Sequence, residues 1–492
     1  MRTRFAPSPT GFMHIGNLRT ALFTYLLTRK NNGKFILRIE DTDQERKIAG
    51  AEEIIYNTLK DCGMYWDEGP DIGGNYGPYI QSERKNIYKE YAERLIELGS
   101  AYYCFCDKER LEKVRSECEA KKIPPMYDGH CRNLSKEEVN EKLASSVPYV
   151  IRQKMPKTGE TFFDDAVFGR VTVENSTLDD QILLKSDGMP TYNFANVVDD
   201  HLMGITHIIR GNEYLSSTPK YNLLYKAFGW EIPEYIHVSP VMEDAQHKLS
   251  KRHGAASYQD FINKGYLKEA IINYIVLLGW SPKQEREKFT MNELIEIFSV
   301  DGISKSPAIF DENKLAWLNG EYIRELSEDE FFEKSKPYII EELGNHTPLD
   351  MRKISKLLQP RLERLADIPE QIDFFVELPA YNTDLFVHKK MKTDKTSSLN
   401  ILKEILILIE NLEHFNSLHD EVIKLVEKKG LKNGQVLYPL RVALSGKQFT
   451  PGGGIEIANI LGKTETIRRI KLAIEKLENK KSPSAITRYA RC

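Results

Sequence analysis

Residues 4–17 read R-F-A-P-S-P-T-G-F-M-H-I-G-N, and the organisation of the chain follows from this stretch. A short apolar run leads into prolines and Gly11, which turn the chain sharply and end the expected strand. Beyond His14, apolar side chains recur at helical spacing until the Asn-Asn-Gly triplet at 31–33 supplies a stop signal. The stretch therefore predicts a strand, a tight loop and a helix whose N-terminus carries His14.

The expected start of this helix is a possible phosphate site. A helix N-terminus offers unpaired N–H groups and a partial positive charge, which suit phosphate. Gly16 would let such a ligand approach the backbone closely. Taken alone, however, a histidine at this place is more often a cap or part of a turn. A phosphate site at His14 therefore needs a second phosphate-handling element elsewhere in the chain.

A second stretch, H-K-L-S-K-R-H-G at residues 247–254, holds three Lys and Arg cations and a hydroxyl within five residues. Alone, such a run is most often a solvated surface loop. Combined with the first stretch, it resembles the two nucleotide-binding signatures of class I aminoacyl-tRNA synthetases, here H-I-G-N and K-L-S-K-R. The prefix R-F-A-P-S-P-T-G narrows the resemblance to the bacterial-type glutamyl-tRNA synthetases.

Further matches to this group follow in order along the chain, from residue 2 to about residue 470. They are R-I-E-D-T-D at 38–43, D-E-G-P at 67–70, L-L-K-S-D-G-M-P-T-Y at 183–192, N-V-V-D-D-H at 196–201 and L-N-G-E-Y-I at 318–323. Chance does not produce several independent motifs in a shared order.

The composition of the 492 residues, 41% hydrophobic and 29% charged, is that of an ordinary globular chain of about three domains. A net charge of −3 excludes bulk polycation behaviour, so RNA binding must come from local basic patches. No apolar run reaches membrane length, and the first residues leave no room for a signal peptide. The six unevenly placed cysteines suggest no disulfide framework, so we expect a cytoplasmic protein.

The expected fold is α/β. The resemblance implies a class I Rossmann-type nucleotide-binding domain, an inserted α+β acceptor-binding domain, and an all-α C-terminal anticodon-binding half. The implied domains are 1–103 with 189–254 (catalytic), 104–188 (inserted), 255–320 (stem contact) and 321–492 (anticodon binding). Sequence patterns predict strands at 35–40, 181–186, 205–210 and 235–238, helices ending at Gly63, Gly99 and Gly229, and a helix or buried turn at 192–198. No further strand alternation is seen after about residue 255.

Three cysteines of the inserted region could together hold zinc: Cys104, Cys106 and Cys131. The alternative interpretation, three buried or idle thiols, stays open because Cys-x-Cys is tighter than the usual ligand spacing. Some glutamyl-tRNA synthetases carry zinc through Cys-x-Cys, a later cysteine and a fourth His or Tyr. Asn133 stands where some members have that histidine, which leaves Tyr127 or His130 as the fourth ligand of a structural zinc.

The resemblance implies a two-step reaction. The glutamate α-carboxylate attacks the α-phosphorus of ATP and releases pyrophosphate, and the adenylate then acylates the tRNA 3′ end. Catalysis is then mostly positioning and charge stabilisation, with magnesium arriving with ATP. The implied catalytic residues are His14, Lys248 and Lys251. The implied ATP-binding residues are Pro7, Ser8, His14, Gly16, Asn17, Lys248, Leu249, Ser250, Lys251 and Arg252.

Choosing glutamate requires a cation for its second carboxylate, which a guanidinium can grip with two parallel hydrogen bonds. The resemblance implies three groups of glutamate-binding residues: Arg4, Tyr192 and Asn196 for the side-chain carboxylate; Arg210 for the α-carboxylate; and Ser8 and Glu40 for the ammonium group, with Ala6 in the same set. Glutamine would leave the charge of Arg4 uncompensated, which is a physical reason for preferring glutamate.

The implied partner is tRNA-Glu, contacted through Asp43, Gln359 and Arg361 by a monomeric chain. Some members of the group place an arginine just before the Pro-Arg that corresponds to residues 360–361, where it reads the last anticodon base and excludes tRNA-Gln. This chain has Gln359 there. The hypothesis that follows is relaxed discrimination, with tRNA-Gln also glutamylated.

Four other functions compete with this interpretation. A glutaminyl-tRNA synthetase would end in β-barrels, whereas residues 361–429 have helical spacing. A shortened relative that glutamylates a modified tRNA base lacks the anticodon domain. A small-molecule adenylyltransferase would leave the long helical half unexplained. A non-enzymatic RNA-binding protein conflicts with the intact set of implied site residues.

Overall fold

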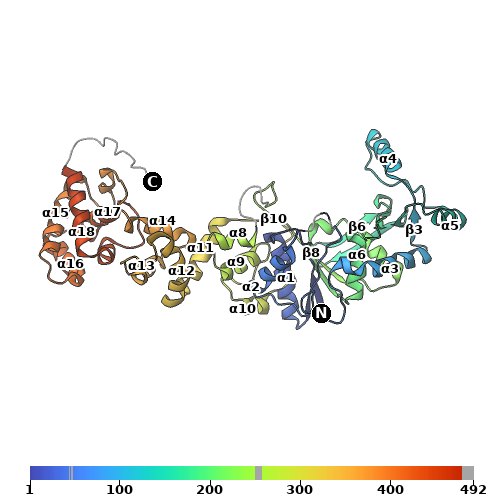
Figure 1. Ribbon diagram of the computed structural model, residues 1–492, viewed down its shortest axis with the longest axis horizontal. Helices are drawn as coiled ribbons and strands as arrows, with labels where there is room; N and C mark the ends of the chain where they lie inside the picture. The colour runs from blue at the N-terminus through green and yellow to red at the C-terminus, as the bar shows by residue number, and fades with distance from the viewer. Residues whose placement is uncertain (44, 46–47, 250–256, 479–492) are drawn as a thin grey trace. The chain divides into compact units, whose positions relative to one another are not determined.

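The computed structural model covers residues 1–492 and describes all of them except 44, 46–47, 250–256 and 479–492. The chain divides into two compact units, residues 1–262 with 268–315 and residues 263–267 with 316–492. The first unit mixes helices and strands, and the second is helical in its described part (Figure 1). The expected α/β region followed by a helical half is therefore confirmed. No helix in the described ranges is both long and apolar enough to cross a membrane.

A parallel layer forms the centre of the first unit. Its strands are β1 (Arg2–Phe5), β2 (Lys34–Leu37), β8 (His207–Gly211) and β9 (Glu234–Val238). β1 pairs with β2 and β8 with β9, both in parallel, and β1 lies beside β8 because Thr206 N donates to Arg2 O at 2.9 Å. The chain runs from β1 to β2 on one side and from β8 to β9 on the other. In such sheets ligands bind where the connections diverge, outside the carboxyl ends of the strands.

Helix α1 (Ile15–Lys30) connects β1 to β2 and is buried along most of its length. His14 is its N-cap, as the sequence predicts, and Asn31 is its C-cap. The Thr3 and Thr28 hydroxyl oxygens lie 2.5 Å apart and tie β1 to the helix. This contact holds the last turn of α1 against β1, while the N-terminus of the helix follows the proline-rich turn that leaves the carboxyl end of the strand.

Strands of the inserted region form two further pairings. They are β3 (Ala101–Cys104), β4 (Val150–Gln153), β5 (Glu160–Asp165), β6 (Gly169–Glu174) and β7 (Ile182–Leu184). β3, β4 and β7 make an antiparallel sheet, and β5 pairs with β6 in a second antiparallel pair. β5 also joins the parallel layer, because Asp165 is the bridge partner of Tyr235 in β9. The inserted region thus adds a strand beside the nucleotide-binding layer, which the sequence did not predict.

Helices cover these sheets. They are α2 (Ala51–Asp61), α3 (Lys85–Glu97), α4 (Lys108–Ala120), α5 (Lys136–Ala144), α6 (Tyr192–Leu202) and α7 (Thr218–Phe228), with short 3₁₀ turns η2 (Gln81–Arg84), η3 (Asn175–Thr177) and η4 (Asn212–Tyr214). Residues 192–198, predicted as a helix or a buried turn, are helical. α7 ends at Gly229 with φ +70°, a left-handed conformation that favours glycine. Buried side chains of α3, α6 and α7 share one apolar core with β3 and β7.

The last part of the first unit adds helices and one more strand pair. The elements are β10 (Val241–Met242), α8 (Tyr258–Asn263), α9 (Lys268–Leu277), α10 (Met291–Ile297), η5 (Val300–Gly302) and β11 (Ala308–Ile309). β10 and β11 pair in parallel. β11 lies in the part after about residue 255 where the sequence shows no strand alternation. A strand of two residues is too short to show an alternating pattern, and its pairing comes from β10 far back in the chain.

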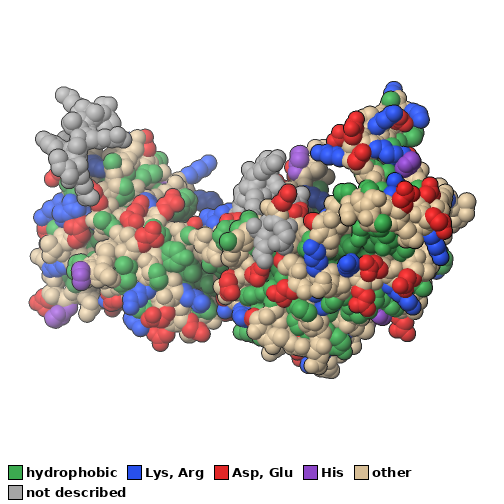
Figure 2. Space-filling view, turned by 45° about the vertical axis from the view of Figure 1, so that its right-hand side comes forward, with side chains coloured by type: hydrophobic (Ala, Val, Ile, Leu, Met, Phe, Trp, Pro, Cys, Tyr) green, Lys and Arg blue, Asp and Glu red, His purple; other side chains and the backbone are tan. Residues whose placement is uncertain are grey.

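The second unit is a stack of helices. They are α11 (Glu312–Glu325), α12 (Glu328–Leu343), α13 (Met351–Leu358), α14 (Ile368–Ile372), α15 (Lys395–Glu410), α16 (Leu418–Lys428), α17 (Asn433–Ser445) and α18 (Gly454–Glu478), with 3₁₀ turns η6 (Leu365–Asp367), η7 (Asp373–Phe375), η8 (Thr383–Phe386) and η9 (Phe415–Ser417). The buried Arg469 of α18 donates to Leu444 O at 2.6 Å and ties α18 to α17. On the face shown in Figure 2, acidic and basic side chains are interspersed, in keeping with the small net charge.

Candidate active site

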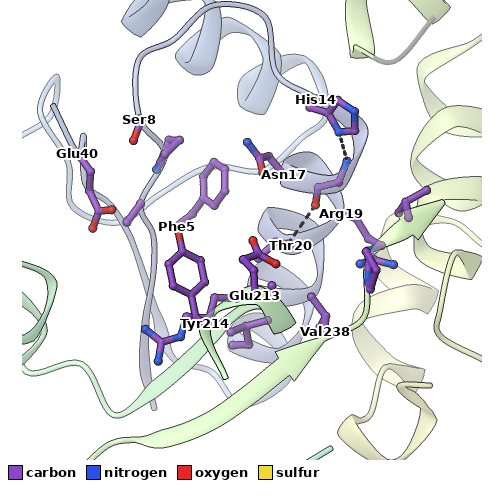
Figure 3. A pocket seen from close by; sticks show the side chains of 18 of the residues that line it. Phe5, Ser8, His14, Asn17, Arg19, Thr20, Glu40, Glu213, Tyr214 and Val238 are labelled. Carbon is purple, nitrogen blue, oxygen red and sulfur yellow. Dashed lines mark hydrogen bonds between the residues drawn. The ribbon is translucent and has the colours of Figure 1, made fainter. Parts of the chain in front are cut away.

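A cavity of about 320 Å³ opens at the carboxyl ends of β1 and β8 (Figure 3). Twelve of the predicted ATP-binding and glutamate-binding residues line it: Arg4, Ala6, Pro7, Ser8, His14, Gly16, Asn17, Glu40, Tyr192, Arg210, Lys248 and Leu249. Ser250, Lys251 and Arg252 lie outside the described residues. Side chains from distant parts of the chain therefore meet at the place that the sheet topology favours.

Of the described residues predicted to bind ATP or glutamate, Asn196 is the one that does not line this cavity. It is buried on α6, one helical turn after Tyr192, and its Nδ2 donates to the Tyr192 carbonyl oxygen at 2.8 Å. Tyr192 itself stacks on Tyr214, with ring centroids 5.4 Å apart. Asn196 thus lies behind the tyrosine that faces the cavity.

The turn after β1 brings His14 to the cavity wall. Gly11 has φ +113°, a conformation that L side chains rarely adopt, so the turn needs glycine there. His14 Nδ1 accepts a hydrogen bond from Gly16 N at 3.0 Å, which caps α1 (Figure 3). Since Nδ1 is the acceptor, Nε2 carries the proton and donates to Leu249 O at 2.9 Å. The first signature and the described part of the second stretch are therefore in direct contact.

A buried ion-pair network holds Arg4 at the floor of the cavity. Arg4 Nε donates to Asp200 Oδ1 at 3.0 Å, and Arg38 Nη1 donates to the same oxygen at 2.8 Å. Arg38 Nη2 also donates to Glu40 Oε1 at 2.9 Å. All four side chains are at least 95% buried. Asp200 and Arg38 thus fix two predicted glutamate-binding residues from behind.

The neighbouring Asp199 anchors the same helix from the other side. Its Oδ1 accepts from Arg84 Nε at 2.7 Å, and its Oδ2 accepts from Tyr88 Oη at 2.8 Å and Gln81 Nε2 at 2.9 Å. The sequence motif N-V-V-D-D-H contains Asp199 and Asp200, but its two aspartates were given no role. Two adjacent acids directly after the apolar pair Val197-Val198 are the signal that could have identified this anchor.

The charges of the network shift the pKa values of its carboxyl groups in opposite directions. Burial raises the pKa of Glu40, although Arg38 and Arg4 oppose the shift. For Asp200, burial also acts upward, but Arg4 and Arg38 outweigh it and lower the pKa. Asp200 is therefore held ionised as the counter-ion of the two guanidinium groups, which permits their burial.

Arg210 is a buried cation without a carboxylate partner among the described residues. Its Nη2 donates to Thr218 Oγ1 at 2.8 Å and its Nε to His237 Nε2 at 3.2 Å, while Nη1 is buried with no hydrogen-bond partner in the described structure. Its guanidinium lies 4.7 Å from the Tyr221 ring centroid and 5.2 Å from that of Tyr214. An incoming anion would supply the missing charge and the missing acceptor.

Glu213 and Tyr214 also line the cavity and were not predicted (Figure 3). They follow β8 directly, in η4, so they lie at the strand end where ligands bind in such folds. The position just after a predicted strand was the available signal. Glu213 is thus, with Glu40, a second carboxylate in the lining of the cavity.

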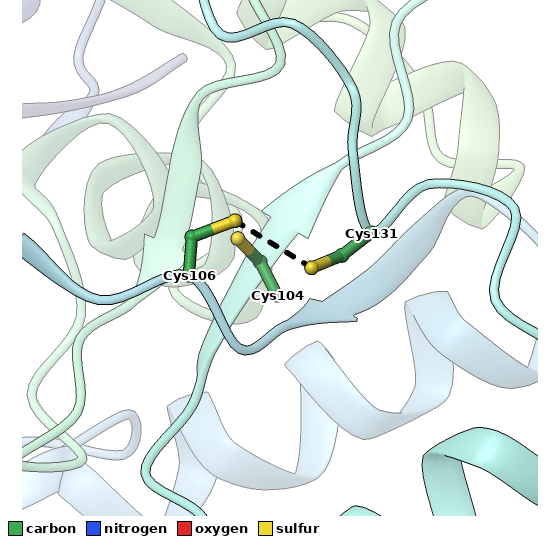
Figure 4. Close-up of side chains that lie close together, drawn as sticks. All are labelled: Cys104, Cys106 and Cys131. Carbon is green, nitrogen blue, oxygen red and sulfur yellow. Dashed lines mark hydrogen bonds between the residues drawn. The ribbon is translucent and has the colours of Figure 1, made fainter. Parts of the chain in front are cut away.

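A separate cluster in the inserted region joins three of the predicted metal ligands (Figure 4). The Sγ atoms of Cys104, Cys106 and Cys131 all lie within 4.8 Å of one another. The Tyr127 hydroxyl lies 3.3 Å from Cys104 Sγ and 3.4 Å from Cys106 Sγ, whereas His130 is exposed. The geometry therefore gathers three thiols and one phenol, a donor set that could hold a metal.

The predicted RNA-contact residues are not among those that line this cavity. Asp43 is exposed after the β2 region. Gln359 donates its amide hydrogens to Ile323 O at 3.1 Å and Leu326 O at 2.7 Å, so its side chain holds the backbone of its own unit. Arg361 lines a cavity of about 470 Å³ in the second unit. The other lining residues are Glu370, Gln371, Arg441, Lys447, Phe449, Thr450 and Pro451.

Comparisons with known proteins cover both units. The family model described as tRNA synthetases class I (E and Q), catalytic domain, matches residues 1–317, and an anticodon binding domain model matches residues 330–474. The chain is 61% identical to a glutamate–tRNA ligase of Clostridium botulinum and 59% identical to that of Clostridium acetobutylicum. Each match covers 97% of this chain and 99% of the relative. A glutamate tRNA ligase from Elizabethkingia meningosepticum, solved in complex with its amino acid, has a TM-score of 0.87 at 38% identity, covering 97% of this chain and 99% of that one.

These matches extend over almost the whole chain and confirm the resemblance inferred from its motifs. A single-domain adenylyltransferase and the shortened relative without an anticodon domain do not fit the second match. A glutaminyl enzyme ending in β-barrels does not fit the described helices of the second unit. The chain belongs to the class I tRNA synthetases of the glutamate and glutamine (E and Q) group.

Proposed function

We propose that the cavity between β1 and β8 is where this chain, a glutamate–tRNA ligase, activates L-glutamate with ATP before transfer to tRNA-Glu. One observation carries the proposal: two kinds of anion-binding group lie in a single cavity. Buried guanidinium groups come from Arg4 and Arg210, and the N-terminus of α1 contributes His14 beside Lys248. A dicarboxylic amino acid and a triphosphate suit these two kinds of group.

Arg4 is assigned to the side-chain carboxylate of glutamate. Its Nε is committed to Asp200, and no further hydrogen bond is formed by this guanidinium among the described residues. Nη1 and Nη2 are therefore available for parallel bonds to a carboxylate. Tyr192 lies on the same wall, and Asn196 acts from behind by holding the Tyr192 backbone.

The other end of glutamate is assigned to Arg210, Ser8 and Glu40. Arg210 has a buried nitrogen that lacks an acceptor, which the α-carboxylate would provide. Ser8 and Glu40 lie on the same side of the cavity (Figure 3), and the Glu40 carboxylate would receive the ammonium group. Ala6, which follows β1 directly, also lines the cavity.

ATP is assigned to the other side, beside His14, Gly16 and Asn17. The helix N-terminus, His14 and Lys248 would hold phosphate oxygens and neutralise the charge that develops on phosphorus. His14 Nε2–H is bonded to Leu249 O, so binding of phosphate at this nitrogen must replace that bond. Magnesium would enter with ATP and neutralise phosphate charge. The cluster of possible metal ligands in the described residues is a different one, made of three cysteines of the inserted region. Lys251 would neutralise the charge that develops on the leaving pyrophosphate.

The test is ATP–pyrophosphate exchange with the full chain, glutamate and tRNA. We expect exchange that depends on glutamate and is not supported by glutamine. The exchange should be run with and without tRNA, because glutamyl enzymes generally need tRNA to activate the amino acid. An absence of exchange under both conditions would contradict the proposal.

The finer domain division is also proposed: a catalytic domain of residues 1–103 and 189–254, an inserted acceptor-binding domain of 104–188, a stem-contact domain of 255–320, and an anticodon-binding domain of 321–492. The family matches at 1–317 and 330–474 support the outer boundaries. We also propose a cytoplasmic monomer, and the free cysteines of the described residues suit a reducing compartment.

We expect the chain to glutamylate purified tRNA-Gln as well as purified tRNA-Glu. Gln359 uses its amide to hold two backbone carbonyls, which leaves no cationic fork at the position that reads the last anticodon base. The variant Gln359→Arg should lower charging of tRNA-Gln by about 10-fold relative to tRNA-Glu. Initial rates of glutamylation with each tRNA measure the effect, and no product from tRNA-Gln with the unaltered chain would end the hypothesis.

One structural zinc is proposed for the cysteine cluster, because the donor set fits it. Tetrahedral zinc–sulfur bonds of about 2.3 Å place sulfurs about 3.8 Å apart. Cys106 Sγ and Cys131 Sγ are 3.6 Å apart, and Tyr127 supplies a fourth donor at 3.3 and 3.4 Å from two of the sulfurs. The ion would fasten the loop before α4 to the loop before α5, far from the chemistry.

Metal analysis tests this site. The purified chain should contain about one zinc per molecule, and Cys131→Ser should lose it and unfold at a lower temperature. Cys118→Ser is the matched control, because Cys118 lies on α4 in the same region but outside the cluster. Equal zinc content in the two variants, measured by elemental mass spectrometry, would refute a cysteine-bound zinc.

A further inference from the structure

We propose that His237 and Asp165 form a positioning pair for Arg210, holding its guanidinium so that one nitrogen faces the α-carboxylate of glutamate. His237 lies on β9 and Asp165 at the end of β5, behind the β8 strand end that carries Arg210. The inference rests on the proposed role of Arg210 and extends it to two residues that do not line the cavity.

The hydrogen bonds fix the protonation of the His237 ring from both sides. Asp165 Oδ2 lies 2.6 Å from His237 Nδ1 and also accepts from His237 N at 3.1 Å. An ionised carboxylate only accepts, so Nδ1 carries the ring proton. Arg210 Nε only donates, and it lies 3.2 Å from His237 Nε2, which must therefore be an unprotonated acceptor.

Thr218 secures the second nitrogen of Arg210. Its hydroxyl donates to Tyr214 O at 2.8 Å and accepts from Arg210 Nη2 at 2.8 Å. With Nε on His237 and Nη2 on Thr218, Nη1 is the nitrogen without a partner in the described structure. The guanidinium is thus clamped along one edge, and Nη1, buried in a residue that lines the cavity, is the nitrogen left for a ligand oxygen.

The pair is itself held rigidly. Asp165 Oδ1 accepts from Val167 N at 3.0 Å and from Phe168 N at 2.8 Å, so both carboxylate oxygens are used. His237 is fully buried and Asp165 is 4% exposed. Asp165 belongs to β5, the strand that joins the inserted region to the parallel layer. The Asp165–His237 hydrogen bond therefore connects β5 to Arg210 through the His237 ring.

The arrangement makes glutamate binding sensitive to acid. The groups that face His237 are Asp165 from β5, Arg210 from β8, Glu213 from η4, Thr218 from α7 and Tyr235 from β9. Burial and the charge of Arg210 lower the pKa of His237, although Asp165 opposes the shift. The neutral ring is therefore the working form at neutral pH. As the pH falls, protonation of His237 Nε2 would place an N–H opposite the Arg210 Nε–H, so the hydrogen bond between them is lost. This loss weakens the hold on Arg210 and also destabilises the fold.

Steady-state aminoacylation by the full-length chain tests the pair. His237→Asn keeps a donor toward Asp165 but removes the acceptor from Arg210, so the KM for glutamate should rise about 10-fold while the KM for ATP and kcat change by less than about twofold. His237→Gln places an amide oxygen near the lost Nε2 and should recover part of this loss. In the unaltered chain the KM for glutamate should rise only at acidic pH, below the ordinary pKa of histidine, and this rise should be smaller in both variants. Glu40 titrates in the unaltered chain and in both His237 variants alike, so its effect on the KM for glutamate cancels when their pH profiles are compared.

The matched control is His207→Asn. His207 on β8 also pairs with a carboxylate, Glu234 at 3.2 Å, but it does not line the cavity, so its loss should leave the KM for glutamate unchanged. Arg210→Gln separates the two levels of the proposal. An unchanged KM for glutamate in Arg210→Gln would refute the role of Arg210 itself. If the KM for glutamate rises in Arg210→Gln but stays unchanged in His237→Asn, the positioning pair alone is refuted. The same holds if the pH dependence of this KM in His237→Asn equals that of the unaltered chain.

Discussion

Replacing Arg4 with glutamine (Arg4→Gln) should lower kcat/KM for glutamate about 10³-fold while the KM for ATP stays within about twofold. The Arg4 side chain is 4% exposed and lines the cavity, and Asp200 holds its Nε. In the variant, the side-chain carboxylate of bound glutamate would be removed from water without a positive charge beside it. Aminoacylation kinetics at saturating tRNA measure both constants.

Arg2→Gln is the matched control for this variant. Arg2 lies two residues earlier on the same strand and therefore on the same face, but its guanidinium pairs with Glu68 at 2.8 Å outside the cavity. We expect its loss to cost stability and to leave glutamate kinetics unchanged. Equal losses of kcat/KM in the two variants would show that the Arg4 effect comes from damage to the strand.

The second large effect is expected at His14. His14→Asn should reduce glutamate-dependent ATP–pyrophosphate exchange by about 10² to 10³-fold, because the ring nitrogen that would donate to phosphate is lost. Asparagine is a good N-cap residue, so it keeps the hydrogen bond that Gly16 N now gives to the histidine ring. Thermal unfolding should therefore change little.

His14→Ala separates capping from catalysis. It loses the cap as well as the ring and should destabilise the chain by about 1 kcal/mol more than His14→Asn, with a similar loss of exchange. If His14→Asn kept full exchange activity, His14 would be a capping residue only, as its place before a helix also allows.

The sequence predicted the elements whose signals are local. The helix after His14 is recognisable from its cap, its apolar spacing and its stop at residues 31–33, and α7 from a proline near its start and Gly229 at its end. The cavity residues were identified by motifs, and the sheet explains their meeting: the motifs lie at the carboxyl ends of neighbouring strands.

The supporting residues could not be predicted in the same way. Asp200 lies 196 residues from Arg4 and 162 from Arg38, and an aspartate on a helix normally faces solvent. Asp165 lies in the inserted region, and its contact with His237 depends on one parallel bridge between β5 and β9. Such pairings follow from the packing of distant segments, which leaves no periodic trace in the chain.

The most direct measurement is aminoacylation of total tRNA with labelled glutamate and labelled glutamine in competition. Buried arginine at the cavity floor predicts loading of glutamate, with glutamine incorporated at less than about 10⁻³ of that rate. Comparable incorporation of the two amino acids would contradict the assignment of Arg4, and with it the account of how this cavity selects its substrate.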